Sequence, residues 1–343
     1  MVMNGIRDRA IGALAGLALG DALGMPTQSM SRERIAERYG LITGLRAAGP
    51  DQPIAPGLPA GTVTDDTEQA LLLAHLLIDG AGEIDAVAFA CALSRWEADM
   101  VRRGSADLLG PSTKRAIQRL HDGESPDETG RDGTTNGAAM RITPVGIAVP
   151  VTDPAALVDA VVAASRVTHN TGIAIAAAAA VAAAVSAGVA GAGLADALDA
   201  AEGAAAAGAR RGHWRAGGDV GARISWVRGW VRGMGRAALA GAVADVVGTS
   251  VAAQESVVAA FALVEALGTE PLDALTLAAE LGGDTDTVAA ICGAVLGAHH
   301  GVAGLPADLV ATVCRVNSLD LAPVADGLLE LRRRAGGDGG RRS

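Results

Sequence analysis

Two short acidic motifs hold the residues best suited to chemistry. Residues 64–67 read TDDT and residues 282–287 read GGDTDT, and each motif stands directly before an apolar stretch. Adjacent carboxylates repel one another, and a bound cation removes that cost. Oxygen ligands without His or Cys favour Mg²⁺ or Mn²⁺ over zinc or copper. Four carboxylates can hold two such ions about 3.5–4 Å apart, an arrangement with which hydrolases activate a water and orient substrate oxygens.

Helix capping is the alternative interpretation of both motifs. Asp65, followed three residues later by Glu68, fits a capping box, and acidic residues in a first turn interact favourably with the helix dipole. A cap needs only one side-chain oxygen, whereas each motif offers two carboxylates with flanking hydroxyls. Both interpretations predict that a helix begins at each motif.

The elements that position these motifs are predicted to be helices. Apolar residues recur at intervals of three and four over most of the chain, and no long stretch alternates apolar and polar residues as a strand would. The predicted helices are 6–23, 68–78, 84–100, 112–120, 155–165, 173–186, 254–267, 272–281, 287–298, 307–316 and 324–333. We therefore predict an all-α fold, a compact single-domain bundle of many helices over residues 1–334, followed by a glycine-rich disordered tail at 335–343.

Two long loops interrupt the helical pattern. Residues 44–61 contain four prolines, and residues 121–137 are polar with several glycines. Loops of this length inside a compact chain are usually functional or disordered. Because each loop ends on a candidate motif, we expect both to serve a functional site.

Composition excludes some classes of protein. The 343 residues carry a formal net charge of −10 and include only four Trp, two Phe and one Tyr. Neither property suits a nucleic-acid binder, which must neutralise phosphates and stack on bases. Cys91, Cys292 and Cys314 are far apart and form no disulfide framework or zinc spacing. We therefore expect a cytoplasmic protein that does not bind nucleic acid.

Two apolar stretches could be mistaken for membrane segments. Residues 11–20 follow two arginines, as in a signal peptide, but they lead directly into Asp21 and Gly24, which we include in the candidate site. Residues 171–195 are uncharged and long enough to span a bilayer, but they consist mostly of alanine with glycine. Such residues suit close helix packing, so we predict no membrane span.

Several motifs together resemble the ADP-ribosylglycohydrolase family. In chain order they are GLALGDALG at 16–24, TDDT at 64–67, GAAMR at 137–141, Thr168-His169, GTSVAAQE at 248–255 and GGDTDT at 282–287. The resemblance covers residues 8–305 and rests on separate motifs, which makes it more specific than a single pattern. It implies a compact all-α domain with a dinuclear Mg²⁺ or Mn²⁺ centre at the base of a cleft.

The resemblance also implies roles for individual residues. The metal ligands would be Thr64, Asp65 and Asp66 from one side and Asp284, Asp286 and Thr287 from the other. Asp65, Asp66 and Asp286 would also take part in catalysis. Family members cleave the bond between the anomeric carbon of a terminal ribose and its acceptor.

The substrate-binding residues implied by the resemblance come from four segments. The backbone around Asn136, Gly137 and Ala138 would hold phosphate or ribose, and Asp21 would belong to the same site. His169 would lie near the diphosphate or the distal ribose; the alternative is a structural histidine whose ring nitrogens are already hydrogen-bonded.

Asp107 and Gln28 are the two candidate residues at which this sequence departs from the family pattern. Asp107, in SADLLG at 105–110, resembles an aspartate that some bacterial relatives place opposite the metals and could protonate the leaving group or act as a base. The spacing to Gly110 is one residue longer, however, and a solvated aspartate at a helix end is the alternative. Gln28 stands where many relatives have Glu. It keeps an oxygen but loses the charge, which indicates either a different leaving group or weaker catalysis.

An Arg- and Trp-rich segment spans residues 210–236. It holds seven arginines and three of the four tryptophans, Trp214, Trp226 and Trp230. Trp226 and Trp230 are four residues apart, as are Arg228 and Arg232, so on a helix they would form neighbouring stripes. The segment is either a surface helix that packs its tryptophans inward or a lid that stacks on a base and binds phosphate.

These observations predict an Mg²⁺-dependent glycohydrolase with two metal ions, which removes ADP-ribose from a protein side chain or a small conjugate. One alternative is an N-glycosidase for a smaller nucleoside-like or ribosyl metabolite, which Gln28 and the scarcity of aromatic residues favour. A second alternative is a binding relative without activity, which the two intact acidic motifs argue against.

Overall fold

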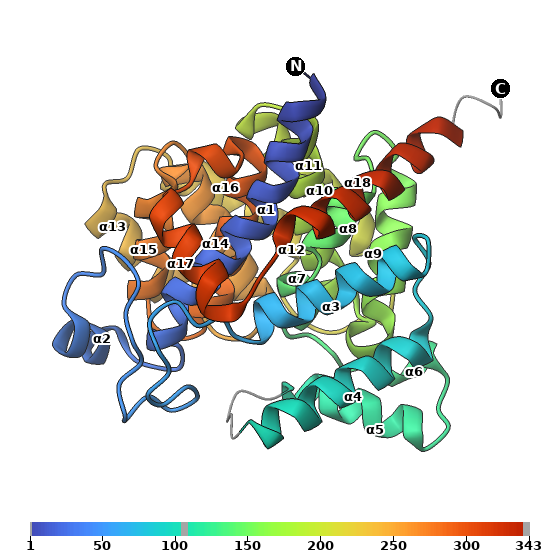
Figure 1. Ribbon diagram of the computed structural model, residues 1–343, viewed down its shortest axis with the longest axis horizontal. Helices are drawn as coiled ribbons and strands as arrows, with labels where there is room; N and C mark the ends of the chain where they lie inside the picture. The colour runs from blue at the N-terminus through green and yellow to red at the C-terminus, as the bar shows by residue number, and fades with distance from the viewer. Residues whose placement is uncertain (1, 104–108, 339–343) are drawn as a thin grey trace.

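A computed structural model describes residues 2–103 and 109–338 (Figure 1). The longer helices are α1 (Val2–Gly24), α2 (Arg32–Tyr39), α3 (Asp65–Asp79), α4 (Ala86–Arg102), α5 (Pro111–His121), α9 (Pro154–His169), α10 (Gly172–Ala190), α11 (Leu194–Gly208), α12 (Val220–Val231), α14 (Ala253–Leu267), α15 (Pro271–Glu280), α16 (Thr285–His300), α17 (Ala307–Asn317) and α18 (Leu321–Asp338). Shorter helical segments are η1 (Met25–Thr27), α6 (Pro126–Thr129), α7 (Gly137–Met140), α8 (Thr143–Ala148), α13 (Arg236–Gly241), η2 (Ala242–Val247), which is a π-helix, and η3 (Val302–Gly304). In these two described ranges there are isolated β-bridges but no strand. The prediction of a compact, single-domain, all-α fold is confirmed.

All eleven predicted helices are present, with ends that shift by a few residues. Helices α2 and α11 were not predicted, and α12 was expected only in one of the two alternatives for segment 210–236. α2 buries only Ile35, and α11 is rich in Ala and Gly, so neither carries a strong apolar period. The predicted loop at 121–137 contains the single turn of α6, and α18 extends four residues into the predicted tail. Residues 339–343 lie outside the described residues.

A seam of glycines joins α1 to α16, and the two helices run side by side (Figure 1). A Cβ on Gly12, Gly16 or Gly20 would lie 2.3, 2.0 or 2.0 Å from a backbone oxygen of α16. Only glycine allows this approach, and the repeat of four residues keeps all three on one face of α1. The seam brings the C-terminal end of α1 against the start of α16, where the GGDTDT motif lies.

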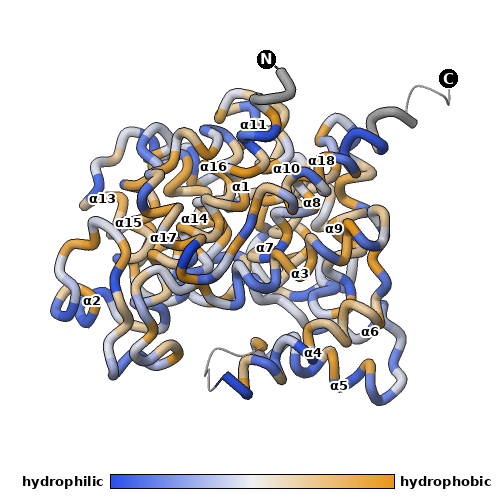
Figure 2. The backbone as a smooth tube through the Cα atoms, viewed as in Figure 1, coloured by the Kyte–Doolittle hydropathy of each residue, from blue (hydrophilic) through white to orange (hydrophobic). Residues whose placement is uncertain are grey.

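Helix α10 forms the centre of the bundle and packs against α8, α9, α11 and α16. Two stretches, Gly5–Thr27 and Gly172–Ala190, are long and apolar enough to cross a membrane by length and composition, and 94% of the most apolar window of each is buried inside the protein. Strongly polar residues gather instead on peripheral segments such as α2 and the C-terminal part of α18 (Figure 2). These apolar stretches therefore serve as core helices of the fold.

Helices α4, α5 and α6 form a layer beside α3 and α9 (Figure 1). The indole Nε1 of Trp96 in α4 donates to Glu68 Oε2 at 2.5 Å, and Arg103 pairs with the same carboxylate at 3.0 Å. These contacts fasten α4 to the first turn of α3. The start of α5 then borders the cavity described next.

Candidate functional site

A cavity of about 210 Å³ lies where the starts of α3 and α16 meet α7 and the end of α9. The predicted site residues that line it are Gln28, Asp65, Asn136, Gly137, His169, Asp284, Asp286 and Thr287. Its wall also includes residues that were not predicted, among them Gln69, Thr135 and Val251. Segments from both ends of the sequence therefore form one site.

Backbone contacts join the loops that contribute residues to this cavity. Gly282 and Gly283 adopt φ values of +78° and +76°, which side-chain-bearing residues rarely adopt. This conformation lets Gly283 form a bridge with Met30, and the neighbouring Asp284 N donates to Thr249 O at 2.7 Å. Asn136 N donates to a carbonyl of the same loop, 248–252, at 2.9 Å. The acidic motif and the 131–137 segment are thus joined through one loop.

Asp21 anchors the TDDT motif through hydrogen bonds to its two threonines. Its buried carboxylate accepts hydrogen bonds from the backbone N–H and the hydroxyl of both Thr64 and Thr67, at 2.5–3.1 Å. Burial is the dominant influence and raises the pKa of Asp21 to about 6, although these hydrogen bonds oppose it. Asp21 does not line the cavity. Because its hydrogen-bond partners are Thr64 and Thr67, Asp21 instead holds the first turn of α3 in position.

The capping interpretation of TDDT is only partly correct. Thr64 is the N-cap of α3, and its hydroxyl accepts from Asp66 N. The expected capping box between Asp65 and Glu68 does not form, because Asp65 already lies inside the helix and Glu68 binds Trp96 and Arg103. The two carboxylates of the motif are therefore not needed as caps. Asp284 is the N-cap residue of α16 but makes no side-chain capping hydrogen bond.

Four carboxylates converge at the base of the cavity. Thr287 Oγ1 in α16 donates to Asp66 Oδ2 in α3 at 3.1 Å, which links the two acidic motifs directly. Burial and then the neighbouring charges of Asp286 and Asp65 hold the pKa of Asp66 well above its usual range. Burial also raises the pKa of Asp284, despite the hydrogen bond that Asn136 donates to it at 2.5 Å. Burial therefore disfavours the charged forms of both Asp66 and Asp284, and for Asp66 the neighbouring carboxylates add to this effect.

The donor set at the base of the cavity fits a hard cation. Asp66 Oδ1 is buried and has no hydrogen-bond partner, which is costly for a carboxylate oxygen. All candidate ligands are Asp or Thr oxygens, as Mg²⁺ and Mn²⁺ prefer. In residues 2–103 and 109–338 there is no preformed group of three or more Asp, Glu, His or Cys side chains placed to hold a metal ion. The carboxylates would therefore have to turn toward a cation as it binds.

A buried polar chain runs from the acidic cluster to His169, which also lines the cavity. Gln69 Nε2 donates to Asp65 Oδ2 at 2.9 Å, and Arg141 bridges Gln69 Oε1 at 3.2 Å and Thr168 Oγ1 at 2.6 Å. His169 Nδ1 lies 2.8 Å from the same hydroxyl. The roles of Gln69 and Arg141 were not predicted; Arg141 ends the GAAMR motif, but its burial depends on tertiary packing.

Two hydrogen bonds and a close contact with Gly137 fix the imidazole ring of His169. Its Nδ1 meets Thr168 and its Nε2 lies 2.8 Å from Thr135 Oγ1, so both ring nitrogens have partners, as the structural alternative predicted. Burial and then the charge of Arg141 hold the pKa of His169 well below its usual range. A Cβ on Gly137 would lie 2.8 Å from the imidazole Cε1, so this position accommodates the ring because it lacks a side chain.

Some predicted residues lie away from the cavity wall. Thr64 and Asp66 are buried beneath it, and Ala138 is buried within α7. Gln28 does line the cavity; its side chain is buried, and its Nε2 has no hydrogen-bond partner. Asp107 lies outside the described residues.

None of the three tryptophans of segment 210–236 lines this cavity. Trp226 and Trp230 stack on each other in α12, with ring centroids 5.0 Å apart, and Trp226 remains half-exposed. Arg228 is buried and pairs with Glu265, Glu202 and Asp199, which fastens α12 to α14 and α11. Trp214 is 81% exposed and borders a separate cavity.

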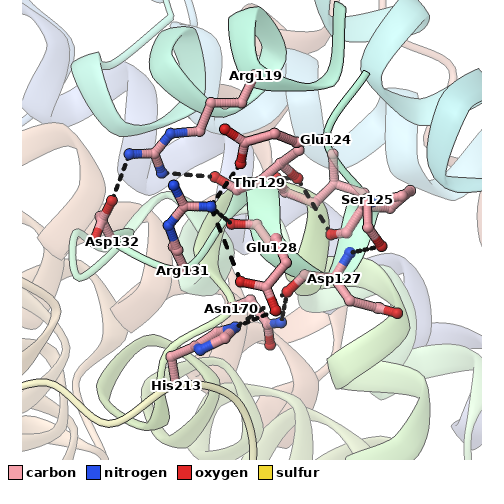
Figure 3. A network of polar contacts seen from close by, with 12 residues as sticks. Arg119, Glu124, Ser125, Asp127, Glu128, Thr129, Arg131, Asp132, Asn170 and His213 are labelled. Atoms are coloured by element: carbon pink, nitrogen blue, oxygen red, sulfur yellow. Dashed lines mark hydrogen bonds and ion pairs between the residues drawn. The ribbon is translucent and has the colours of Figure 1, made fainter. Parts of the chain in front are cut away.

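A network of ion pairs and hydrogen bonds fixes the segment that leads to Asn136 (Figure 3). Arg119 in α5 donates to Asp132 at 2.6 Å and to the Thr129 carbonyl at 3.3 Å. Arg215 pairs with the other oxygen of Asp132. Asn170 Nδ2 donates to a carbonyl of α6 at 2.6 Å, so residues 122–136 are tied to α5, to the end of α9 and to segment 210–236.

Known proteins resemble this chain in sequence and in fold. The family model described as ADP-ribosylglycohydrolase matches residues 3–338. The chain is 34% identical to YegU of Escherichia coli (strain K12), over 95% of this chain and 98% of that one. It is also 34% identical to the ADP-ribosyl-[dinitrogen reductase] glycohydrolase of Rhodospirillum rubrum, over 50% of this chain and 55% of the relative.

A solved structure agrees with the sequence relationship. The chain described as an ADP-ribosylglycohydrolase-related protein complex superposes with a TM-score of 0.67 at 26% identity, covering 97% of this chain and 99% of that one. The family model spans residues 3–338, a range that includes both acidic motifs, and the resemblance noted from the sequence motifs is confirmed. The chain therefore belongs to the ADP-ribosylglycohydrolase family.

Proposed function

We propose that this protein is an Mg²⁺-dependent hydrolase that releases ADP-ribose from ADP-ribosylated protein, using two divalent cations. The observation that carries the proposal is the buried, unpartnered Asp66 Oδ1 within a cluster of four carboxylates at the base of a cavity. The cluster gains stability from a cation, and the family is one of glycohydrolases. Mn²⁺ has the same ligand preference and is an acceptable substitute.

Six residues from the two acidic motifs are the proposed ligands of the cations. Thr64, Asp65, Asp66, Asp284, Asp286 and Thr287 would hold the cations. When bound, the cations would supply Lewis-acid activation of a water molecule and hold ribose hydroxyls.

The two carboxylates on the cavity wall are positioned by neighbouring groups. Gln69 fixes the orientation of Asp65, and the backbone N–H of Thr287 donates to Asp286 Oδ1 at 3.0 Å. Glycoside cleavage passes through an oxocarbenium-like state, whose positive charge these carboxylates stabilise. Either can accept the proton of the attacking water. Gln28 faces the same cavity but cannot act as a base, because an amide does not ionise.

The cavity volume limits how much of the substrate it encloses. Pockets that bury a whole small-molecule ligand usually measure about 300–1,000 Å³, whereas this cavity measures about 210 Å³. It therefore suits the terminal ribose, with the remainder of ADP-ribose extending across its mouth. Relatives named for hydrolysis of ADP-ribosyl-[dinitrogen reductase] and of ADP-ribosylarginine support a protein substrate.

A second candidate is hydrolysis of a smaller riboside. The same small volume favours it, as does the absence of Phe, Tyr and Trp among the described residues that line the cavity. Tight binding of ADP-ribose by calorimetry, with no turnover of simple ribosides, would remove this candidate.

Substitution of the cavity-lining carboxylates tests the proposal. Asp65→Ala and Asp286→Ala should abolish Mg²⁺-dependent release of ADP-ribose from modified protein while the variants remain folded by circular dichroism. Asp79→Ala is the matched control, because Asp79 is an exposed aspartate at the far end of the same helix, α3. Full Mg²⁺-dependent activity in folded Asp65→Ala and Asp286→Ala would overturn the assignment of the site.

A further inference from the structure

A second cavity lies between the starts of α10 and α12 and the loop 209–219, which joins α11 to α12. Its volume of about 360 Å³ exceeds that of the cavity with the four carboxylates (the acidic cavity) and falls in the range of small-molecule sites, about 300–1,000 Å³. No described residue lines both cavities. Gly172, Gly212, Gly217 and Gly218 line the second cavity, and because they lack side chains a ligand can approach the backbone closely.

The indole of Trp214 borders this second cavity and is open to solvent. Trp214 is 81% exposed, which makes it the most exposed of the four tryptophans. The residues on both sides of it are fixed: His213 N donates to Asn170 O at 2.8 Å (Figure 3), and Arg215 pairs with Asp132. An indole on such a fixed backbone presents a flat apolar face, on which a planar ring of a ligand can stack at little cost in entropy.

The wall of the second cavity carries more positive than negative charge. Arg210 is exposed, and its side chain forms no hydrogen bond or ion pair with another described residue. Arg215 also lines the cavity, and its Nη1 donates to Trp214 O at 3.1 Å. Among the described residues of the wall, Asp219 alone has a carboxylate, and its Oδ1 already accepts from Ala222 N at 2.7 Å as the N-cap of α12. A guanidinium without a partner is well suited to bind phosphate oxygens.

We propose that the second cavity is a binding site for a nucleoside phosphate, with the base stacked on Trp214 and the phosphate bound by Arg210. A nucleoside phosphate combines the planar ring and the negative charge that this wall accommodates. The net charge of −10 favours such a small anion over a nucleic-acid strand. The inference goes beyond the proposed function and does not depend on it, because no residue of the acidic cavity takes part.

Titration with AMP in EDTA tests the stacking residue. EDTA removes divalent cations, so the acidic cavity cannot bind phosphate through a metal ion. By calorimetry, AMP should bind with a Kd below about 1 mM, and it should quench tryptophan fluorescence. Trp214→Ala should weaken this binding about tenfold, as expected for loss of one base–aromatic stack. Trp226→Ala is the matched control, because Trp226 is an exposed tryptophan outside the second cavity, and it should bind AMP as the unsubstituted protein does.

The two halves of AMP test the roles of the base and the phosphate. Adenosine and ribose 5-phosphate should each bind at least about tenfold more weakly than AMP, because each lacks one of the two contacts. Arg210→Met should weaken binding of AMP about tenfold and leave binding of adenosine unchanged. Arg102→Met, which removes an exposed arginine from α4, is the control and should change neither.

The outcomes that would overturn the site are distinct from failure of the proposed function, since none of them involves release of ADP-ribose. Absence of AMP binding up to about 1 mM, or equal affinity in Trp214→Ala, would overturn the site. Ribose 5-phosphate that binds as tightly as AMP would overturn the stacking, and adenosine that binds as tightly would overturn the role of Arg210. Asp286→Ala should bind AMP in EDTA as the unsubstituted protein does; weaker binding would place AMP in the acidic cavity and overturn a separate site.

Discussion

Gly20→Ala is expected to impair the site without touching it. Gly20 lies on the seam between α1 and α16, and a Cβ there would lie 2.0 Å from the carbonyl oxygen of Ala289. The residue next to it, Asp21, anchors the TDDT motif, and α16 begins within the other acidic motif. A change in the separation of the two helices therefore changes the separation of the two halves of the site.

The expected magnitude follows from the geometry of the seam. To reach an ordinary contact of 3.4 Å, the helices must separate locally by roughly 1.4 Å. Overpacking of this kind costs about 1–3 kcal/mol of stability. A misplacement of about 1 Å in an active site can cost about 100-fold in rate. Gly20→Ala should therefore retain its fold at moderate temperature and lose most of its activity.

Alanine substitutions at different positions along the seam distinguish a loss of stability from a displacement of the site. Gly12→Ala introduces a similar clash, 2.3 Å from Gly297 O, but about 12 Å farther from Asp21 along α1. It should be destabilised about as much as Gly20→Ala and lose much less activity. Gly203→Ala is the control, because Gly203 lies inside α11 with nothing within 4 Å of its Cβ position; it should be neutral or more stable by about 0.5–1 kcal/mol.

The assays are urea unfolding for stability and initial rates of ADP-ribose release at a temperature where every variant is folded. Equal loss of activity in folded Gly12→Ala and Gly20→Ala would refute the reasoning, because the effect would then not depend on distance from the site. A Gly20→Ala protein as stable as the parent would refute the geometry of the seam itself.

Four further outcomes are expected. Asp66→Asn should raise the stability of the metal-free protein by on the order of 1–3 kcal/mol, by removing a buried like charge, and should abolish turnover; lower stability in EDTA would contradict this. Because burial raises the folded-state pKa of Asp21 to about 6, the folded protein binds a proton that the unfolded chain has lost, so the contribution of Asp21 to the stability of the metal-free protein should fall by about 2–2.5 kcal/mol between pH 4 and pH 7; urea unfolding in EDTA should show a smaller fall in Asp21→Asn. Gln28→Glu adds a charge to the cavity wall and should tighten Mg²⁺ binding about tenfold or more in calorimetry; unchanged affinity would count against the acidic cluster as the Mg²⁺ site. Arg332→Met should lower the free energy of unfolding in urea by about 2–4 kcal/mol, because it leaves the carbonyls of Gly146, Ile147 and Val149 without their hydrogen-bond donor. A loss below about 1 kcal/mol would show that water replaces the guanidinium.

The local features of the site could be predicted from the sequence. The acidic motifs at the starts of α3 and α16 were predicted because a helix start depends on nearby residues: apolar periodicity after the motif and polar residues within it. The helices themselves followed from the same periodicity. The predicted gathering of both motifs at one cavity came from the family resemblance, because no local rule brings residue 65 beside residue 286.

The features that depend on packing could not be predicted. Gly12, Gly16 and Gly20 are spaced for a close helix contact, but only the fold shows that α16 fills the space. Asp21 was predicted to belong to the site, but its partners, the threonines of TDDT, are more than forty positions away. The hydrogen-bonded chain from Gln69 through Arg141, Thr168 and His169 to Thr135 joins three segments, in α3, at 135–141 and at the end of α9, and no spacing in the sequence relates them.

The pairing of α1 with α16 has a consequence for synthesis on the ribosome. Translation proceeds at about 5–20 residues per second, so α1 emerges on the order of tens of seconds before the helix that covers its glycine face. During that time an apolar helix has no native partner along this face. The acidic cluster assembles only when α16 arrives, so an incomplete chain cannot acquire a working site.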